Sequence, residues 1–275
     1  EFVEAGVKAV ILIGGGEPLA HPKIGEFMDY LGRNDIHIGI TTNGTFIDRY
    51  LDVKAKYSSW TRISMDAGTT ETFRALRPTK AGRSKFEKIV DNMRKLSKVK
   101  KGKLGFSYLI QTEADGDGVI NNIDEIYLAA QLAKDIGCDY FEVKPTYNFR
   151  NDVAHSLMKH DKTEMDHAKK VISKLDELES DDFKILKAIN LKYSLDGVDK
   201  PQPKDYKKCP STYLRTLVTP GGAYVCPYWR GKDNMKIGDV NTVSFSAMWK
   251  GYERAEVMNN LDASRDCNFH CLRHE

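Results

Sequence analysis

The run Val10-Ile11-Leu12-Ile13-Gly14-Gly15-Gly16-Glu17-Pro18 decides how the first half of the chain is expected to fold. Its apolar, mostly β-branched start predicts a strand, and the glycines that follow predict a loop at the carboxyl end of that strand. Parallel α/β proteins bind their ligands at this end of the strands. Glycines also let backbone N–H and C=O groups approach a ligand closely, because no Cβ intervenes. The loop is therefore a candidate binding loop.

Two common glycine-rich binding motifs do not fit this loop. A dinucleotide-binding fingerprint needs G-x-G-x-x-G leading into a helix, but Leu19 stands where the last glycine should be. A phosphate-binding loop needs Gly-Lys-Ser or Gly-Lys-Thr, and neither is present here. Taken alone, the loop also fits a tight turn that binds no ligand.

Strands and helices alternate through the first half of the chain. Apolar and β-branched runs predict strands at 8–13, 37–42, 60–65, 104–110 and 140–144. Amphipathic stretches predict helices at 23–33, 48–56, 85–96 and 123–136. Each helix follows a strand, which is the pattern of strand–helix units around a parallel sheet. A flat doubly wound sheet and a curved partial barrel both fit this pattern.

Composition excludes several classes of protein. Lys and Arg total 42 against 39 for Asp and Glu, so the net charge of +3 gives no strong attraction to nucleic acid or to a membrane surface. No apolar run is long enough to suggest a membrane span. The 5 cysteines are an odd number and cluster near the end of the chain, which argues against a disulfide framework. We expect a cytoplasmic protein with neither a nucleic-acid partner nor a membrane partner.

The pattern changes after Pro145, which predicts further domains. A charged helix is expected over 162–179, followed by a linker over 195–208 that is rich in Pro, Gly and charged residues. From Cys209 onward, a hairpin that turns at Gly221-Gly222 and a helix over 245–258 suggest a small module. The expected domains are a core over 1–150, a connecting helix and linker over 151–208, and a cysteine module over 209–275.

The strand-end motifs occur in the order of a known family. The segment from Gly15 to Pro18, Gly-Gly-Glu-Pro, resembles the motif with which radical S-adenosylmethionine (SAM) enzymes bind the methionine amino group. Thr-Thr-Asn-Gly at 41–44 and Ser-Met-Asp-Ala-Gly at 64–68 then follow at the next strand ends. The resemblance implies an α/β fold, a partial (β/α)6 TIM-like barrel truncated at its N-terminus, with a small C-terminal α+β cluster-binding domain.

The resemblance also assigns roles to single residues. It places the backbone of Gly15 and Gly16, with Glu17 nearby, at the methionyl amine, and it places Ser64 and Asp66 at the ribose or the carboxylate of SAM. These residue types suit the ligand, since carboxylates accept hydrogen bonds from ammonium and hydroxyl groups. Asn43 either positions SAM or holds a turn, and Arg77 either pairs with the SAM carboxylate or forms a surface salt bridge. The expected SAM-binding residues are Gly15, Gly16, Glu17, Pro18, Asn43, Ser64, Asp66 and Arg77.

Four cysteines near the end of the chain predict a metal site. They are Cys209, Cys226, Cys267 and Cys271. Zinc and iron-sulfur clusters both prefer thiolate ligands, so the number of cysteines does not choose between them. The wide spacing of Cys209 and Cys226 disfavours a zinc ribbon. The phrase C-x11-G-x4-C at 209–226 resembles the opening of SPASM and twitch domains, which implies one auxiliary 4Fe-4S cluster of the twitch type.

One defining motif of the family is absent from this sequence. Radical SAM enzymes hold the radical-generating 4Fe-4S cluster with C-x3-C-x2-C, but no cysteine precedes Cys138, which we interpret as a core thiol. We expect the motif to lie before Glu1 in the intact protein. The catalytic residues are therefore unknown, and this chain alone should not cleave SAM.

The resemblance implies an enzyme in its intact form. That enzyme would be a radical SAM oxidoreductase or maturase, with a flavodoxin or ferredoxin as electron donor. Its substrate would be a small polyol, sugar or nucleoside, or a peptide. The alternative is a scaffold or binding protein that a four-cysteine zinc site stabilises without catalysis. Metal content separates the two hypotheses.

Overall fold

The computed structural model describes residues 1–111, 114–115, 118–119, 121–150, 153–156, 162–197 and 204–267. The chain forms two compact units. The sheet unit consists of Lys8–Asn148 and Ser156–Asp199, and the cysteine unit consists of Glu1–Val7, Phe149–His155 and Lys200–Glu275. This division into two units does not test the three domains expected from the sequence, whose limits stay a prediction.

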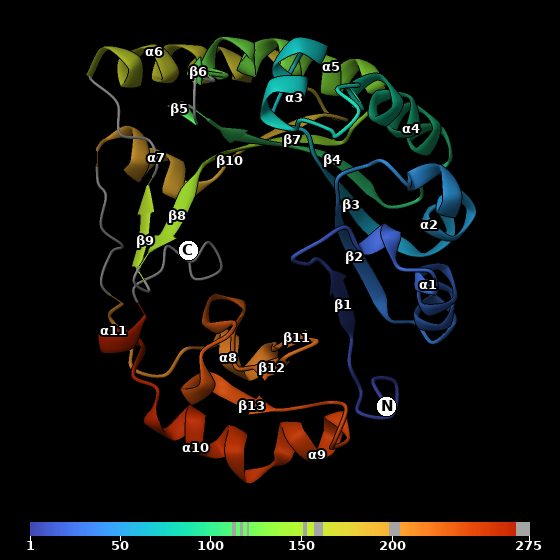
Figure 1. Cartoon of the computed structure of the whole chain (residues 1–275), viewed down its shortest axis with the longest axis vertical. Helices are drawn as coiled ribbons and strands as arrows, with labels where there is room; N and C mark the ends of the chain where they lie inside the picture. The colour runs from blue at the N-terminus through green and yellow to red at the C-terminus, as the bar shows by residue number, and fades with distance from the viewer. Residues whose placement is uncertain are drawn as a thin grey trace. The chain divides into compact units, whose positions relative to one another are not determined.

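The sheet unit is built on six parallel strands in the order β1-β2-β3-β4-β7-β10 (Figure 1). The strands are β1 (Ala9–Leu12), β2 (His37–Thr42), β3 (Ser58–Ser64), β4 (Lys103–Ile110), β7 (Tyr140–Pro145) and β10 (Lys184–Lys187). The described strands form an open, curved sheet whose edges are β1 and β10. The predicted α/β fold is confirmed, and the arrangement is that of a partial TIM-like barrel.

Helices cover the convex face of this sheet (Figure 1). The α-helices are α1 (Ile24–Arg33), α2 (Leu51–Tyr57), α3 (Thr70–Leu76), α4 (Phe86–Val99), α5 (Ile126–Ile136), α6 (Lys162–Ser173) and α7 (Ile189–Leu195). Short 3-10 helices occupy Pro18–Ala20, Ile47–Tyr50, Ile123–Glu125 and Lys174–Leu178. Alternate strand residues such as Ile40, Ile63 and Phe106 are fully buried toward the helices. The residues between them face the concave side, because successive side chains of a strand point to opposite faces.

Several short elements of the sheet unit escape prediction from the sequence, among them α7, β10 and α3. β10 reads Lys-Ile-Leu-Lys, and only Ile185 in it is buried, so it lacks the apolar run that marks an inner strand. α3 spans only two turns and begins at Thr69, whose hydroxyl accepts a hydrogen bond from the Thr72 N–H. These elements are too short for hydrophobic periodicity to reveal them.

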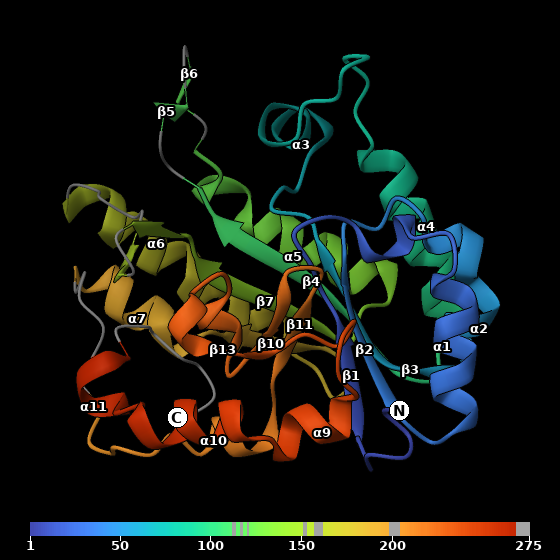
Figure 2. The same ribbon diagram turned by 60° about the horizontal axis from the view of Figure 1, so that its bottom comes forward.

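Loops at the carboxyl ends of the strands carry small additional elements. α3 follows β3, and a hairpin of β5 (Ala114–Asp115) and β6 (Gly118–Val119) follows β4. Figure 2 shows both of them beyond the end of the sheet at which β3 and β4 finish. A separate two-stranded ladder joins β8 (Tyr147–Arg150) and β9 (Val153–Ser156).

Two glycines on the concave face make room for aromatic rings of the neighbouring strands. A Cβ at Gly39 would lie 2.3 Å from Cε2 of Trp60, and one at Gly105 would lie 2.0 Å from Cζ of Tyr140. Contacts this short would clash. The indole ring therefore covers Gly39 on β2, and the phenol ring covers Gly105 on β4.

The cysteine unit is a small α+β module. Its sheet has the antiparallel order β11 (Leu217–Thr219), β12 (Gly222–Tyr224) and β13 (Lys236–Gly238). Its helices are α8 (Ser211–Leu214), α9 (Phe245–Lys250), α10 (Tyr252–Asn260) and α11 (Ala263–Asp266), with 3-10 turns at Pro227–Trp229 and Asp233–Met235. The predicted hairpin is present, but Thr219 pairs with Gly222, so the turn consists of residues 220–221.

The core of the cysteine unit is apolar and includes the N-terminus of the chain. Val225, Ile237 and Met248 are each at most 2% exposed, and the rings of Phe2 and Phe245 meet edge to face with centroids 5.0 Å apart. In the part of the chain that the structure describes, no helix has the length and apolar character needed to cross a membrane.

Candidate functional site

The glycine loop follows β1 and is exposed from Ile13 to Gly16. A Cβ placed on Gly16 would meet no atom within 4 Å, and one on Gly14 would meet only the backbone of Gly16, at 3.7 Å or more. In contrast to Gly39 and Gly105, packing within the chain does not require glycine at position 16. The exposed backbone leaves room for the close approach of a ligand.

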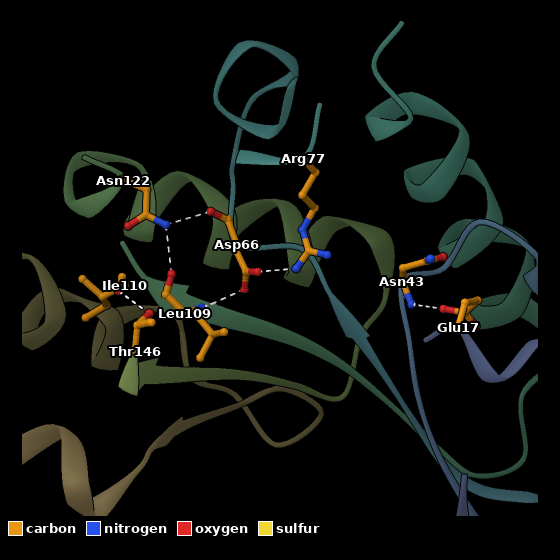
Figure 3. Close-up of polar contacts among 8 residues, drawn as sticks. All are labelled: Glu17, Asn43, Asp66, Arg77, Leu109, Ile110, Asn122 and Thr146. Carbon is orange, nitrogen blue, oxygen red and sulfur yellow. Dashed lines mark hydrogen bonds and ion pairs between the residues drawn. The ribbon is translucent and has the colours of Figure 1, made fainter. Parts of the chain in front are cut away.

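Glu17 ties the glycine loop to the end of β2. One carboxylate oxygen, Oε1, accepts hydrogen bonds from the Leu19 N–H at 2.9 Å and from the Thr42 hydroxyl at 2.6 Å. The other, Oε2, accepts from the Asn43 N–H at 2.7 Å (Figure 3). Pro18 begins the 3-10 helix that Glu17 caps. Glu17 therefore shapes the loop, and its predicted contact with the methionyl amine stays a prediction.

Asn43 holds a turn at the end of β2. Its side-chain Oδ1 accepts a hydrogen bond from the Thr45 N–H at 2.9 Å, while its own N–H donates to Glu17. Both contacts fix the backbone between β2 and the next helix. Of the two roles expected for Asn43, this geometry gives direct support to the turn, and the contact with SAM stays a prediction.

Asp66 is buried just beyond the end of β3, with only 4% of its surface exposed. It adopts a φ of 60°, a conformation uncommon for residues other than glycine. One carboxylate oxygen accepts from the Leu109 N–H at 2.9 Å, and the other forms an ion pair with the Arg77 guanidinium (Figure 3). The structure thus brings together two predicted site residues, Asp66 and Arg77, as partners of each other.

Asn122 is a fully buried residue that the sequence did not single out. Its side-chain amide donates to the carbonyl oxygens of Asp66 at 2.8 Å and Leu109 at 2.9 Å, and its Oδ1 accepts from the Gln111 N–H at 2.8 Å (Figure 3). The Tyr108 hydroxyl donates to its carbonyl at 2.6 Å, and burial raises the pKa of that phenol. Asn122 therefore joins the ends of β3 and β4.

Glu125 anchors the loop that leads from Asp66 into α3. Its carboxylate accepts from the N–H groups of Gly68 at 2.8 Å and Thr69 at 3.1 Å. It also accepts from the hydroxyls of Thr69 at 2.7 Å and Thr72 at 2.6 Å. A Cβ at Gly68 would lie 3.1 Å from the Ala129 N, so the loop passes close to α5. Glycine is the residue that allows this approach.

Two further contacts complete the carboxyl ends of the strands. The Thr146 hydroxyl donates to the Ile110 carbonyl at 2.7 Å and so joins the ends of β7 and β4 (Figure 3). Ser64, at the end of β3, lies in register with Ser107 of β4 on the concave face. Ser64 is half-buried and its side chain faces the side of the sheet that the helices leave uncovered.

A buried lysine lies behind the glycine loop. Lys54 on α2 is 1% exposed, and among the described residues its ammonium nitrogen has no hydrogen-bond partner. Burial lowers the pKa of Lys54 to about 7, and the nearby charge of Glu17 opposes this shift. No pattern in the sequence distinguishes Lys54 from the exposed lysines around it.

Three of the four predicted cluster ligands lie among the described residues of the cysteine unit. Cys226 is buried two residues after the end of β12, and the Arg215 guanidinium donates to its sulfur at 3.8 Å. Cys209 precedes α8, and Cys267 ends α11, whereas Cys271 lies outside the described residues. Among the described residues, no group of three or more His, Cys, Asp or Glu side chains is arranged to hold a metal ion. The four-cysteine site stays a prediction.

Cys138 has the environment of an inert thiol. It is 4% exposed and lies two residues before β7, and burial raises its pKa far above the usual range for a thiol. Its sulfur therefore stays protonated at neutral pH, as expected for a core cysteine.

Residues 1–120 match the model of the Radical SAM superfamily. This part of the chain is similar to radical SAM domains. It contains every residue predicted to bind SAM, from Gly15 to Arg77, and the match indicates an enzyme. The family resemblance is thereby confirmed for the domain, whereas the match does not extend to the cysteine unit, so the SPASM or twitch assignment stays a prediction.

Two solved structures of one protein have a fold similar to that of this chain. The structure of Streptococcus suis SuiB is 13% identical and aligns over 89% of this chain and 55% of SuiB with a TM-score of 0.61. The structure of SuiB bound to S-adenosylmethionine is 14% identical and aligns over 89% of this chain and 54% of SuiB with a TM-score of 0.59. An archaeal TYW1 structure is 21% identical and aligns over 62% of this chain and 50% of TYW1 with a TM-score of 0.41. The chain spans about half the length of these structures, and no curated protein matches its sequence.

Proposed function

We propose that this chain is the SAM-binding part of a radical SAM enzyme. The observation that carries the proposal is the exposed glycine loop after β1, in which Gly16 has open space that packing within the chain does not use. This loop belongs to the radical SAM domain and lies at the carboxyl ends of the parallel strands. Ligands of such sheets bind at these ends.

The backbone of Gly15 and Gly16 is proposed to accept hydrogen bonds from the methionyl amine of SAM. An ammonium group has three N–H donors and no acceptor, so exposed carbonyl oxygens suit it. Glu17 holds the loop in place through its contacts with Thr42 and Asn43 and adds negative charge beside the ammonium group. Because these contacts already exist within the chain, little ordering is needed when the ligand binds.

Arg77 and Ser64 are proposed to bind the carboxylate and the ribose of SAM. The side chain of Arg77 is 34% exposed, and a guanidinium has five N–H donors, so its ion pair with Asp66 leaves donors for a carboxylate. Asp66 positions Arg77 through this ion pair, and its predicted contact with the ribose or the carboxylate of SAM stays a prediction. Ser64 offers a hydroxyl on the concave face, where it can donate to a carboxylate or accept from a ribose hydroxyl.

When SAM is bound beside a reduced 4Fe-4S cluster, it supplies a 5'-deoxyadenosyl radical that abstracts hydrogen from the substrate. The residues of this chain contribute binding and orientation, since C-x3-C-x2-C does not occur in its sequence. For the intact enzyme we propose a small polyol, sugar, nucleoside or peptide substrate and a flavodoxin or ferredoxin as electron donor.

Cys209, Cys226, Cys267 and Cys271 are proposed to hold an auxiliary 4Fe-4S cluster. Support comes from their spacing and from the Arg215 guanidinium, whose positive charge beside Cys226 favours the thiolate. The described cysteines do not form a complete ligand set by themselves, so we assign no step of the reaction to this cluster.

Calorimetric titration with SAM tests the proposed binding loop. Replacing Gly16 by Val fills space that the chain leaves open, so the fold should persist while SAM affinity falls by about tenfold or more. Gly221→Val is the matched control. Gly221 belongs to the cysteine unit, and a Cβ placed on it would meet its nearest atoms at 3.8 Å, so the substitution causes no clash. Absence of SAM binding by the unmodified chain, or equal affinity of the Gly16→Val variant, would refute the proposal.

A further inference from the structure

Three charged side chains meet on the concave face of the sheet. Glu142 on β7 accepts from Arg62 on β3, with 2.9 Å between Nη1 and Oε2, and from Lys144 on β7, with 3.0 Å between Nζ and the same oxygen. Arg62 also donates to the Thr41 hydroxyl at 3.3 Å. The side chains of Arg62, Glu142 and Lys144 are 25%, 14% and 16% exposed, so the cluster is largely but not fully shielded from solvent.

Small residues on the intervening strand allow this cluster to form. β4 lies between β3 and β7, and it places Gly105 beside Arg62 and Ser107 beside Glu142. A Cβ at Gly105 would lie 2.0 Å from Cζ of Tyr140, so glycine there leaves room for the phenol ring on this face. The strand register therefore brings Arg62 and Glu142 together across β4, although they are 80 residues apart in the sequence.

The cluster contains more positive charge than a structural ion pair needs. Two cations share one carboxylate, and both use the same carboxylate oxygen, so the cluster carries a net charge of +1. Among the described residues, Nε of Arg62 is buried without a hydrogen-bond partner. Burial and the charge of Arg62 lower the pKa of Lys144, whereas Glu142 raises it. Buried donors and charges are normally paired, so this cluster is suited to gain an anion.

We propose that Arg62 and Lys144 bind a carboxylate or phosphate group of the substrate, with Glu142 orienting both cations. The inference rests on the proposed function, because it assigns the concave face to the reaction. Ser64, the proposed SAM contact, lies two residues after Arg62 on the same face and in line with Ser107 and Glu142. An anion held by the cluster would lie next to bound SAM, so the substrate belongs to the anionic members of the classes proposed above.

The carboxylate of SAM is the other source of such an anion. Arg77 is proposed to bind that carboxylate, and the two sites use different residues. Parallel titrations with SAM and with small anions therefore distinguish them.

Titration of the chain with inorganic phosphate and with acetate tests the proposal. We expect at least one of the two anions to bind the unmodified chain in the millimolar range, and Arg62→Gln and Lys144→Met to weaken that binding by about fivefold or more. Glu142→Gln should tighten it severalfold, because the net charge of the cluster rises. Lys184→Met, which removes an exposed lysine of β10, is the control and should leave binding unchanged. The affinity for SAM should stay within about twofold in all four variants.

Several results would overturn the inference. If neither anion binds while SAM does, the cluster is not an anion site, and the proposed function still stands. If Lys144→Met or Arg62→Gln weakens SAM binding, the cluster serves SAM and not the substrate. If those two variants fail to fold, the anion affinity of Glu142→Gln tests the inference by itself. A cluster that serves only as a structural ion pair predicts no gain in anion affinity, and that result would contradict the inference.

Discussion

At the scale of single residues, Lys54 has a buried amine whose protonation depends on folding. Its pKa is about 7 in the folded chain and 10.5 when unperturbed. Between these values the unfolded state binds more protons, so the free energy of unfolding should rise with pH, by at most about 1.4 kcal/mol per pH unit. Below pH 7 the penalty for burying the charge is fully present, and above about pH 10.5 it is gone.

Lys54→Met should remove this pH dependence and raise the free energy of unfolding at pH 7. Urea unfolding between pH 6.5 and 10 measures the free energy of unfolding of the variant and of the parent chain. The difference between these two free energies isolates Lys54, because the titration of other groups cancels in it. Lys56→Met is the control, because Lys56 lies on the same helix but is exposed. A difference that does not change with pH would show that Lys54 is not neutralised on folding.

At the same scale, the sequence predicted candidate site residues but not the partners that these residues have in the structure. Asp66 could be placed at the end of a strand from the motif around it. Its contacts with Arg77 and Leu109 span 11 and 43 residues, and its link to Asn122 spans 56, so the register of the sheet decides them. The motif did not indicate that the carboxylate is buried, because burial depends on how β4 and the segment before α5 pack around it.

At the scale of elements, the loop between β3 and α3 depends on one side chain of the segment before α5. Glu125 accepts hydrogen bonds from two backbone N–H groups and two hydroxyls of this loop. Glu125→Gln would replace one carboxylate oxygen by an amide NH2 group, which cannot accept hydrogen bonds from the N–H and hydroxyl groups of the loop. Some of these groups would lose their acceptor, so the free energy of unfolding should fall by about 1–3 kcal/mol. Urea unfolding measures the loss.

Glu87→Gln is the matched control for this element. Glu87 lies on α4, is exposed and accepts from the Thr70 hydroxyl, so its replacement should change stability by less than about 0.5 kcal/mol. If both variants lose the same stability, Glu125 does not anchor the loop.

Long periodic elements were predictable and short ones were not. The five strands predicted from the sequence appear as β1, β2, β3, β4 and β7, and the helices α1, α4 and α5 also appear, all with small shifts at their ends. The helix expected over 245–258 divides into α9 and α10 at Gly251, whose Cβ would lie 2.8 Å from the Ala247 carbonyl oxygen. β10 has one buried side chain, so its pairing with β7 and not its composition makes it a strand.

At the scale of the whole molecule, the metal content decides what the cysteine unit contributes. Its apolar core includes Ile237 and Met248, and of the predicted ligands that the structure describes it contains Cys226 but neither Cys209 nor Cys267. A metal site would therefore add function to the unit instead of supplying its only stabilisation. An auxiliary 4Fe-4S cluster predicts about four iron and four sulfide ions per chain after anaerobic reconstitution.

Cys226→Ser should abolish most of this iron, because a hydroxyl is a poor substitute for a thiolate ligand. Cys138→Ala is the control: Cys138 is buried in the sheet unit, so the iron content should persist. Elemental analysis with a sulfide assay measures both variants beside the parent chain. One equivalent of zinc without iron or sulfide would contradict the cluster and favour a zinc site in the cysteine unit, while SAM binding by the radical SAM domain would be unaffected.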